Sequence, residues 1–267
     1  IELRDLPTIV DKRGRRLAMS RSGELVITDK EGRELAVHRI AYGTVLDVDN
    51  GYYAMAVGSS VTLDHTALLI VDMQGSDMRL DTDSELGQRY PQIVTYWNQR
   101  MEKVVLPNIS RLLDSFRSAG RRVVYTRNGR ITPHGAELTA RLRRHEPKAN
   151  TPPRYRDTPA YDIMPAIAPR EDELIVDKLT SGAFNASILD HSLRNMGVSD
   201  VVIVGIATDM CVFGTARVAA ELGYNALLCE DACATYTARA QEDAMLMHAR
   251  VFGRVATTDD VLAELDS

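Results

Sequence analysis

Apolar runs of strand length alternate along most of the chain with segments that have helical spacing. Mainly apolar runs occur at Ala67–Val71, Arg122–Thr126, Leu174–Val176, Val201–Ile206, Ala226–Cys229 and Arg254–Ala256. Helical patterns occur between or after them, around Val104–Ala119, Ala186–Met196, Cys211–Leu222 and Arg239–Val251. Strands that alternate with helices are typical of a parallel sheet covered on both faces. The pattern therefore predicts an α/β domain with about six parallel strands.

Turn and cap residues set expected limits for these helices. A glycine, Gly120 or Gly223, follows two of the helical patterns, and glycine commonly closes a helix. Pro107 marks the start of the first helix or a kink in it. Thr208 or Asp209 is placed to cap the helix that begins near Cys211.

The first 63 residues have a different pattern. Short mixed runs at 24–28 and 34–38 flank a polar turn and predict a β-hairpin. A second pair of runs, at 43–48 and 52–57, flanks Asn50 and Gly51, which favour a tight turn. We therefore expect a small β-rich N-terminal appendage over residues 1–63 and a main domain over residues 64–267.

Three predicted strands end near residues that can carry chemistry. Asp72, Lys178 and Cys211 each follow an apolar run, and Cys211 also lies at the first turn of a helix. Ligands bind beyond the carboxyl ends of the strands in an open parallel sheet, so these side chains are expected to converge. A carboxylate, an ammonium and a thiol in one crevice form a set suited to covalent catalysis.

Each residue of this set also has a simpler interpretation. Cys211 alone could be a small packing residue, although unpaired N–H groups and the dipole at a helix start favour a thiolate. Asp72 alone could bond nearby amides, and Lys178 alone could be a solvated surface lysine. Their combination favours catalysis. Cys229 and Cys233 are expected to be packing residues, since their spacing does not match a structural zinc site.

Four segments together resemble the isochorismatase-like cysteine hydrolases, a superfamily that includes nicotinamidases and carbamoyl amide, ureidoacrylate and biuret hydrolases. They are Val71-Asp-Met-Gln74, Asp177-Lys178 followed by Ser181-Gly-Ala-Phe184, Gly205–Val212 and Ala226–Ala232. The resemblance covers residues 64 to 265. It implies an open, mainly parallel six-stranded sheet of order 3-2-1-4-5-6, with the site where the winding direction changes.

The resemblance also implies roles for individual residues. Cys211 would attack a carbonyl carbon and form an acyl thioester, and Asp72 would take the thiol proton and pass it to the leaving nitrogen. Lys178 would supply a fixed positive charge. The amides of Ala207 and Cys211 would form an oxyanion hole, and the Ile206–Ala207 bond would be cis.

Gln74, Asn128 and Phe184 match positions that line the pocket in this superfamily. Core packing also explains Phe184, and a turn-forming Asn-Gly pair also explains Asn128. Nicotinamidases carry an Asp-x-His metal pair at the position where this chain has Asn128 and Arg130. We therefore expect no metal and no cofactor.

Histidines and basic residues outside these segments give weaker signals. His134, His145 and His191 show no metal-ligand spacing and are expected to have surface or loop roles. The basic run at 141–156 is either a solvated helix face followed by a loop, or a lid that steers a carboxylate-bearing substrate toward the crevice.

Composition narrows the class of partner. The chain has 32 basic and 37 acidic residues and a net charge of -5, which offers no general attraction for nucleic acid or an anionic membrane. No apolar run approaches the roughly 20 residues that span a bilayer, and the charged residues 1–5 lack the apolar core of a signal peptide. Three cysteines suit a reducing compartment. We expect a cytoplasmic protein that acts on a small molecule, and the resemblance implies a homo-oligomer.

The predicted activity is that of a metal-independent cysteine hydrolase that cleaves the C–N bond of a small amide, carbamoyl or ureido compound. One alternative is an isochorismatase-type ether hydrolase, which Cys211 argues against because isochorismatases lack the cysteine nucleophile. The other alternative is a non-catalytic binding or assembly subunit of the same fold. The intact set of Asp72, Lys178 and Cys211 disfavours that alternative.

Overall fold

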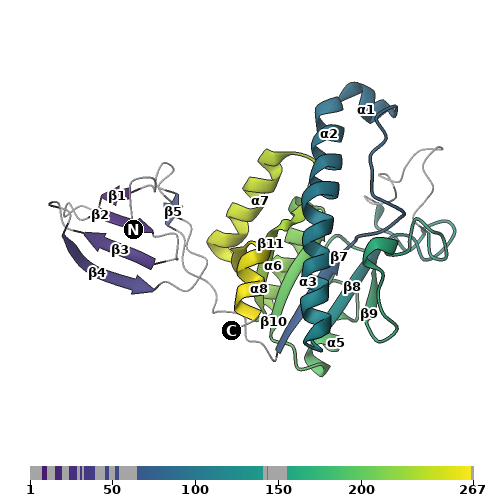
Figure 1. Ribbon diagram of the computed structural model, residues 1–267. Coiled ribbons are helices and arrows are strands. Elements are labelled where there is room, and N and C mark those ends of the chain that lie inside the picture. Colours follow the sequence, from purple (N-terminus) through teal and green to yellow (C-terminus); the bar gives the residue numbers. More distant parts are fainter. Residues whose placement is uncertain are drawn as a thin grey trace.

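A computed structural model of the protein describes residues 65–140, 143 and 155–265, together with short strands, Glu31 and Arg33 in the first 64 residues. Six strands form one sheet in the main domain (Figure 1). They are β7 (Thr66–Val71), β8 (Arg122–Asn128), β9 (Leu174–Lys178), β10 (Asp200–Ile206), β11 (Asn225–Ala234) and β12 (Arg254–Ala256).

The sheet has the expected topology. Its strands lie in the order β9-β8-β7-β10-β11-β12, which in chain order is 3-2-1-4-5-6, and every neighbouring pair is parallel. The winding direction changes between β7 and β10, the two central strands. This confirms the predicted fold class and identifies the carboxyl edge of these strands as the place to look for a site.

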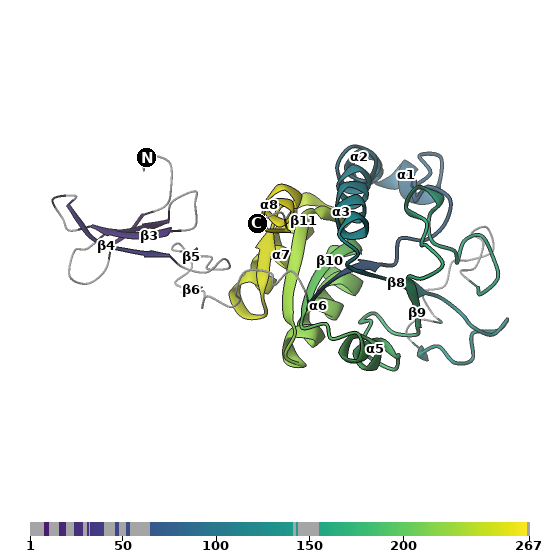
Figure 2. The ribbon, with the colours of Figure 1, turned by 60° about the horizontal axis from the view of Figure 1, so that its bottom comes forward.

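Helices cover both faces of the sheet (Figure 2). Residues from α3 (Leu106–Ser118) and α8 (Thr258–Leu265) pack on one face, and residues from α5 (Leu189–Asn195), α6 (Phe213–Glu221) and α7 (Ala238–Val251) pack on the other. The remaining helical segments are α1 (Glu85–Arg89), α2 (Pro91–Arg100), the π turn η2 (Met101–Val105), the 3-10 turn η3 (Pro165–Ile167) and the π turn η4 (Thr208–Val212).

Some predicted boundaries were wrong. The helix expected over Val104–Ala119 corresponds to α3, with Pro107 in its first turn as expected, but this helix continues directly from α2 and η2 instead of starting anew. Proline has no N–H to donate, and here it comes just after the π turn. The helix expected from Ala186 begins only at Leu189, because Ala186 has a φ of 53°, outside the right-handed helical region.

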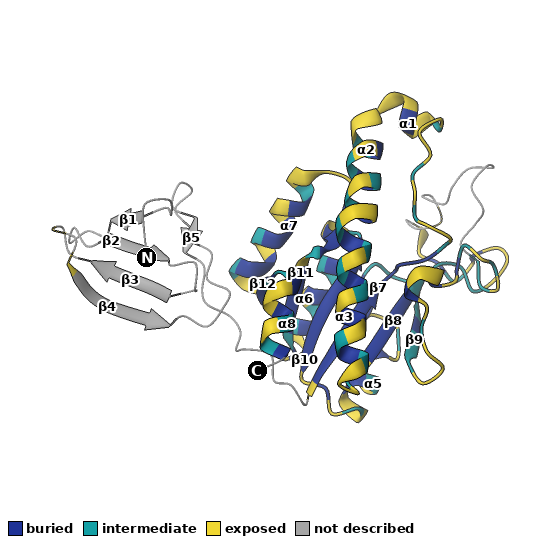
Figure 3. Cartoon of the chain, viewed as in Figure 1, coloured by how far each residue is buried: buried dark blue, intermediate teal, exposed yellow. Residues whose placement is uncertain are grey.

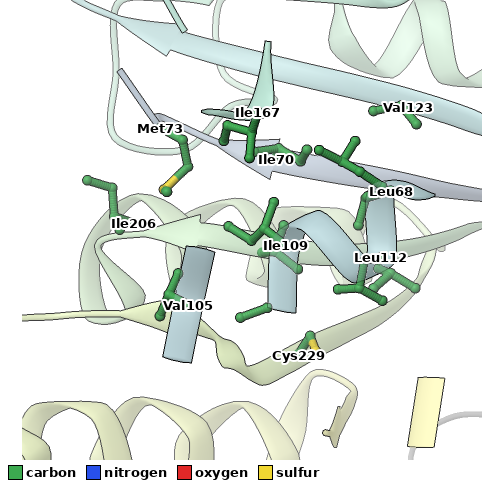
Figure 4. Packing of buried hydrophobic residues seen from close by; sticks show 14 of the residues in the cluster. Leu68, Ile70, Met73, Val105, Ile109, Leu112, Val123, Ile167, Ile206 and Cys229 are labelled. Carbon is green, nitrogen blue, oxygen red and sulfur yellow. The ribbon is translucent and has the colours of Figure 1, made fainter. Parts of the chain in front are cut away.

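The apolar pattern produces two cores, one on each side of the sheet. Every residue of β7 and β10 is buried (Figure 3). Leu68 and Ile70 point toward α3, where they pack in a cluster with Ile109 and Leu112 (Figure 4). Cys229 lies in this cluster and Cys233 lies in the opposite one, both fully buried, as expected of packing residues. The buried central strands fix the positions of the residues at their carboxyl ends.

The N-terminal strands include the two antiparallel pairs that the turn signals predicted. In order along a four-stranded antiparallel sheet they are β1 (Thr8–Val10), β2 (Arg16–Met19), β3 (Glu24–Thr28) and β4 (Glu34–Arg39). A separate antiparallel pair joins β5 (Leu46–Asp47) to β6 (Tyr52–Tyr53). The division of the chain at residue 63 stays a prediction. Most of the basic run at 141–156 lies outside the described residues, as does His145, so their expected roles stay predictions too.

Among the described helices, none is both long enough and apolar enough to cross a lipid bilayer.

Candidate active site

The carboxyl edge of the sheet brings Asp72, Lys178 and Cys211 together. The Lys178 Nζ atom lies 2.8 Å from Asp72 Oδ2 and 3.4 Å from Cys211 Sγ. Asp72 directly follows β7, Lys178 is the last residue of β9, and Cys211 lies in η4, just after β10. Residues separated by more than 130 positions therefore meet because parallel strands end at one edge.

Lys178 is buried and fully hydrogen-bonded. Its side chain is 0 % exposed, so it is not a solvated surface lysine. Its ammonium donates to the carbonyl oxygens of Thr180 and Ser181, each at 2.9 Å, besides its contact with Asp72. Three N–H groups thus meet three oxygen acceptors. A charge this deep is tolerated only when it is paired and hydrogen-bonded in this way.

Asp72 is held by Thr126, a residue that the sequence analysis did not single out. The Asp72 backbone N–H lies 3.2 Å from both the carbonyl oxygen and the Oγ1 atom of Thr126. The Thr126 hydroxyl in turn donates to Asp72 Oδ1 at 2.8 Å. The two carboxylate oxygens therefore have different donors, the hydroxyl on Oδ1 and the Lys178 ammonium on Oδ2. Asp72 has a φ of 54°, a left-handed conformation that turns the chain out of β7.

The surroundings of the Cys211 thiol favour its protonated form. Burial, and after it the neighbouring Asp72 carboxylate, raise the pKa of Cys211 to about 12, and the Lys178 ammonium opposes both effects. The helix start was expected to favour a thiolate, but desolvation has the larger effect here. The resting site therefore holds a neutral thiol next to a carboxylate–ammonium pair.

The turn that carries Cys211 has no side-chain cap. The N-cap residue is Ala207, so the expectation that Thr208 or Asp209 caps this helix was wrong. Thr208 instead donates to Gln241 Oε1 at 2.6 Å, and Asp209 accepts a hydrogen bond from Thr235. These partners on α7 and next to β11 occupy the two side chains that could have capped the turn.

The Ile206–Ala207 peptide bond is cis, as the resemblance implied. The Ala207 carbonyl accepts hydrogen bonds from the amides of Met210 and Val212, at 3.0 and 3.2 Å, and so closes the first turn around Cys211. The structure thus places Ala207 and Cys211 on one tight turn. Their action as an oxyanion hole stays a prediction.

Gly205 allows β10 to approach β7 directly behind Asp72. It has a φ of +111°, and a Cβ atom at this position would lie 2.2 Å from the carbonyl oxygen of Val71. Val71 pairs with Gly205 in the sheet and precedes Asp72 in the chain. A side chain at position 205 would therefore displace the strand end that carries the carboxylate.

Gln74 connects two pieces of backbone next to the site. The Gln74 side chain is buried. Its Oε1 atom accepts a hydrogen bond from the backbone N–H of Asn128, and its Nε2 atom donates to the backbone carbonyl of Tyr161, both at 2.8 Å. The same stretch continues as a short ladder, because Gly75 donates to Asp162 and Met73 accepts from Met164. Residues 73–75 therefore hold the 161–164 segment over the carboxyl edge.

The other two predicted pocket residues lie in different surroundings. Asn128 Nδ2 is 4.0 Å from Cys211 Sγ, so this amide reaches the thiol. Phe184 is buried in the core cluster that includes Val71, and its ring centre lies 5.5 Å from that of Tyr224. Its surroundings support core packing, which was the simpler interpretation.

The charged residues that flank this edge are paired with one another. Asp177 accepts 2.8 Å hydrogen bonds from Arg127 and Arg156. Burial tends to raise the pKa of Asp177, but the two guanidinium groups outweigh it and hold the pKa below its usual value. Arg127 also lies over the ring of Tyr161, 4.8 Å from its centre.

No cluster of three or more histidine, cysteine or acidic side chains that could hold a metal ion occurs within the part of the chain that the structure describes. At the position of the nicotinamidase metal pair, the Asn128 amide points to the Cys211 sulfur and Arg130 donates to the Pro133 carbonyl at 3.1 Å.

Comparison with known proteins agrees with this fold. The isochorismatase domain family matches residues 66–260. The uncharacterized isochorismatase family protein YwoC of Bacillus subtilis (strain 168) is 26% identical over 208 residues, which cover 77% of this chain and 97% of that protein. The ureidoacrylate amidohydrolase RutB of Rhizobium rhizogenes (strain K84 / ATCC BAA-868) is 29% identical over 211 residues, which cover 74% of this chain and 82% of that protein.

A solved structure, that of a cysteine hydrolase from Pseudomonas syringae pv. phaseolicola 1448A, superposes with a TM-score of 0.63 at 26% identity. The superposition covers 78% of this chain and 95% of that one. The family match spans more than half of the chain, from the first strand of the sheet to the last helix. The chain therefore belongs to the isochorismatase family of hydrolases.

Proposed function

We propose that this protein is a cysteine amidohydrolase that cleaves the C–N bond of a small amide, carbamoyl or ureido compound. The observation that carries the proposal is the contact of one buried ammonium with a carboxylate at 2.8 Å and a thiol at 3.4 Å. The similarity to a ureidoacrylate amidohydrolase and to a cysteine hydrolase supports the same class of reaction.

The thiol must be activated before it can attack a substrate. Because the Cys211 pKa is raised to about 12, the free protein holds a thiol, and a base must remove its proton for attack. We assign Asp72 as this base, because its carboxylate interacts with the thiol and raises the Cys211 pKa. The S–H proton moves to the carboxylate while the bonding electrons stay on sulfur and form the new S–C bond. The Lys178 ammonium stabilises the negative charge, whichever of the two groups carries it.

The second half of the reaction returns the proton. The carboxyl group of Asp72 donates to the leaving nitrogen as the C–N bond breaks, which releases ammonia or an amine and leaves an acyl thioester on Cys211. Water then hydrolyses the thioester. The backbone N–H groups of Ala207 and Cys211 are the proposed oxyanion hole, and loss of such a donor typically lowers turnover by about 10²- to 10³-fold.

The described contacts also suggest how a substrate is oriented. The Asn128 amide, 4.0 Å from the sulfur, is the side-chain donor that we expect to bind the carbonyl or ureido group. Gln74 supports the Asn128 backbone, since both ends of its own amide are already bonded. We expect the reaction to need no metal or cofactor, to occur in the cytoplasm and to be carried out by a homo-oligomer.

The proposal is tested by ammonia release from a panel of ureido acids, carbamoyl amino acids, biuret, maleamate and nicotinamide. We expect at least one of these to be hydrolysed, with activity unchanged by a chelator. Cys211→Ala should lower the rate by roughly 10³-fold or more. The matched control is Cys233→Ala, which removes a buried sulfur from the core rather than from the site.

Alkylation gives a second test that needs no substrate. Iodoacetamide should modify Cys211 much faster than Cys229 or Cys233, since only Cys211 has solvent exposure. Amide hydrolysis that persisted in Cys211→Ala would rule out the proposed mechanism. Hydrolysis of an ether substrate without any amide activity would instead identify the rival reaction.

A further inference from the structure

Thr126 is the one side chain in the described site that bonds Asp72 through both its backbone and its carboxylate. It is the fifth residue of β8 and is fully buried. The strand register pairs it with Val71, the residue before Asp72. A hydroxyl in a fully buried strand needs partners, and here both are groups of Asp72.

We propose that Thr126 is a positioning residue that keeps Asp72 in its ionised form and so drives the proton taken from Cys211 onward to the leaving group. This inference rests on the proposed function, because it assigns to Thr126 the control of the base in that reaction.

The direction of the Thr126 hydroxyl carries the argument. Its oxygen accepts the Asp72 N–H at 3.2 Å, so its one proton is free to point to Asp72 Oδ1 at 2.8 Å. The other carboxylate oxygen already faces the Lys178 ammonium at 2.8 Å. Both carboxylate oxygens therefore already accept a hydrogen bond from a neighbour before any proton arrives from the thiol.

This arrangement favours the carboxylate over the carboxylic acid. A proton placed on either oxygen of Asp72 must displace a hydrogen bond from Thr126 or from Lys178, and hydrogen bonds to the charged form favour that form. The state with a thiolate and a protonated Asp72 is therefore a short-lived one. Without the hydroxyl, Asp72 should hold the thiol proton for longer.

The test uses alkylation of Cys211 in the whole 267-residue chain. In Thr126→Val, a methyl group replaces the hydroxyl at similar volume, so more of the protein should exist as thiolate with protonated Asp72. Iodoacetamide should then modify Cys211 roughly 10-fold faster at pH 7, since a hydrogen bond to a charged group shifts an equilibrium by about that factor. Thr126→Ser keeps the hydroxyl and should stay within about threefold of the native rate.

A double-mutant cycle separates this effect from a loosened site. In the Asp72→Asn background the hydroxyl no longer faces an ionisable group, so Thr126→Val should change the alkylation rate by less than about twofold. A variant that merely opened the structure would react faster in both backgrounds, and also at the buried Cys229. Thermal unfolding midpoints check that each variant folds, and Thr126→Ala provides a second variant without the hydroxyl.

An unchanged or slower alkylation rate in the hydroxyl-free variants would overturn the inference, as would an acceleration that persists in the Asp72→Asn background.

A kinetic experiment gives the matching result for catalysis. With a hydrolysed substrate, Thr126→Val should lower kcat by about 10- to 100-fold, whereas Thr126→Ser should stay close to the native kcat. If the native protein hydrolysed no amide, the proposed function would fail, while the alkylation cycle would still decide the role of Thr126.

Discussion

Replacement of Lys178 by methionine tests how far the fold depends on the buried ion pair. Methionine has a similar length but no charge and no donor. In the variant, Asp72 would keep its hydrogen bond from Thr126 but lose the ammonium at 2.8 Å. The carbonyls of Thr180 and Ser181 would each lose a 2.9 Å hydrogen bond.

The magnitude follows from these losses. Breaking a buried ion pair by removing one partner typically destabilises a protein by about 3–5 kcal/mol, because the other charge stays buried and unpaired. An unsatisfied carbonyl adds about 1–3 kcal/mol when water cannot reach it. We expect Lys178→Met to lower the free energy of unfolding by about 5 kcal/mol or more, a large share of the roughly 5–15 kcal/mol of a typical domain.

Urea unfolding at pH 7, followed by the fluorescence of the single tryptophan, Trp97, measures this change. Lys103→Met is the matched control, since Lys103 is exposed and its loss should change stability by no more than about 0.5 kcal/mol. The double variant Asp72→Asn with Lys178→Met should recover about half of the free energy of unfolding that Lys178→Met alone loses. The reason is that Asp72→Asn removes the carboxylate that Lys178→Met leaves buried and unpaired. A loss below about 1 kcal/mol in Lys178→Met, or a double variant as unstable as the sum of the two singles, would refute the reasoning.

Two further predictions concern the scaffold. Gly205→Ala should lower the free energy of unfolding by roughly 2–4 kcal/mol in urea, because the new Cβ atom would lie 2.2 Å from the Val71 carbonyl oxygen. Gly214→Ala is the control and should have a much smaller effect, because its Cβ atom would lie 3.6 Å from the nearest atom, Gly182 Cα. Burial lowers the pKa of His248 from 6.5 to about 4, so its contribution to stability is present above pH 6.5 and is lost as the pH falls toward 4. Protonation of His248 should lower the free energy of unfolding by roughly 3 kcal/mol at most. Urea unfolding of His248→Gln between pH 7 and 4 should show a smaller acid-induced loss of stability than the native protein. The same loss in both proteins would contradict the assignment.

The sequence could predict the main residues of the site because each stands at a strand end. Asp72, Lys178 and Cys211 follow apolar runs, and parallel strands place their carboxyl ends at one edge. Thr126 could not be found in this way. A threonine is an ordinary strand residue, and its importance depends on the register that sets it opposite Val71.

Local signals failed where tertiary contacts compete with them. Thr208 and Asp209 have the side chains of capping residues, but contacts with α7 and with Thr235 take them away from the turn. Ala186 has no residue-type signal for its left-handed backbone, so the late start of α5 could not be predicted. The resemblance matched Gln74 to a position that lines the pocket; the structure adds that its amide joins two backbone segments, and its contact with a ligand stays a prediction.

The ladder between residues 73–75 and 161–164 has a mechanical consequence. Three hydrogen bonds, from Gly75, Met164 and Gln74, anchor the 161–164 segment to the stretch that directly follows Asp72. Displacement of the 161–164 segment would therefore pull on Met73, the residue next to Asp72. A substitution at 161–164 is expected to move the Asp72 carboxylate and to lower the proposed activity without touching any reacting atom.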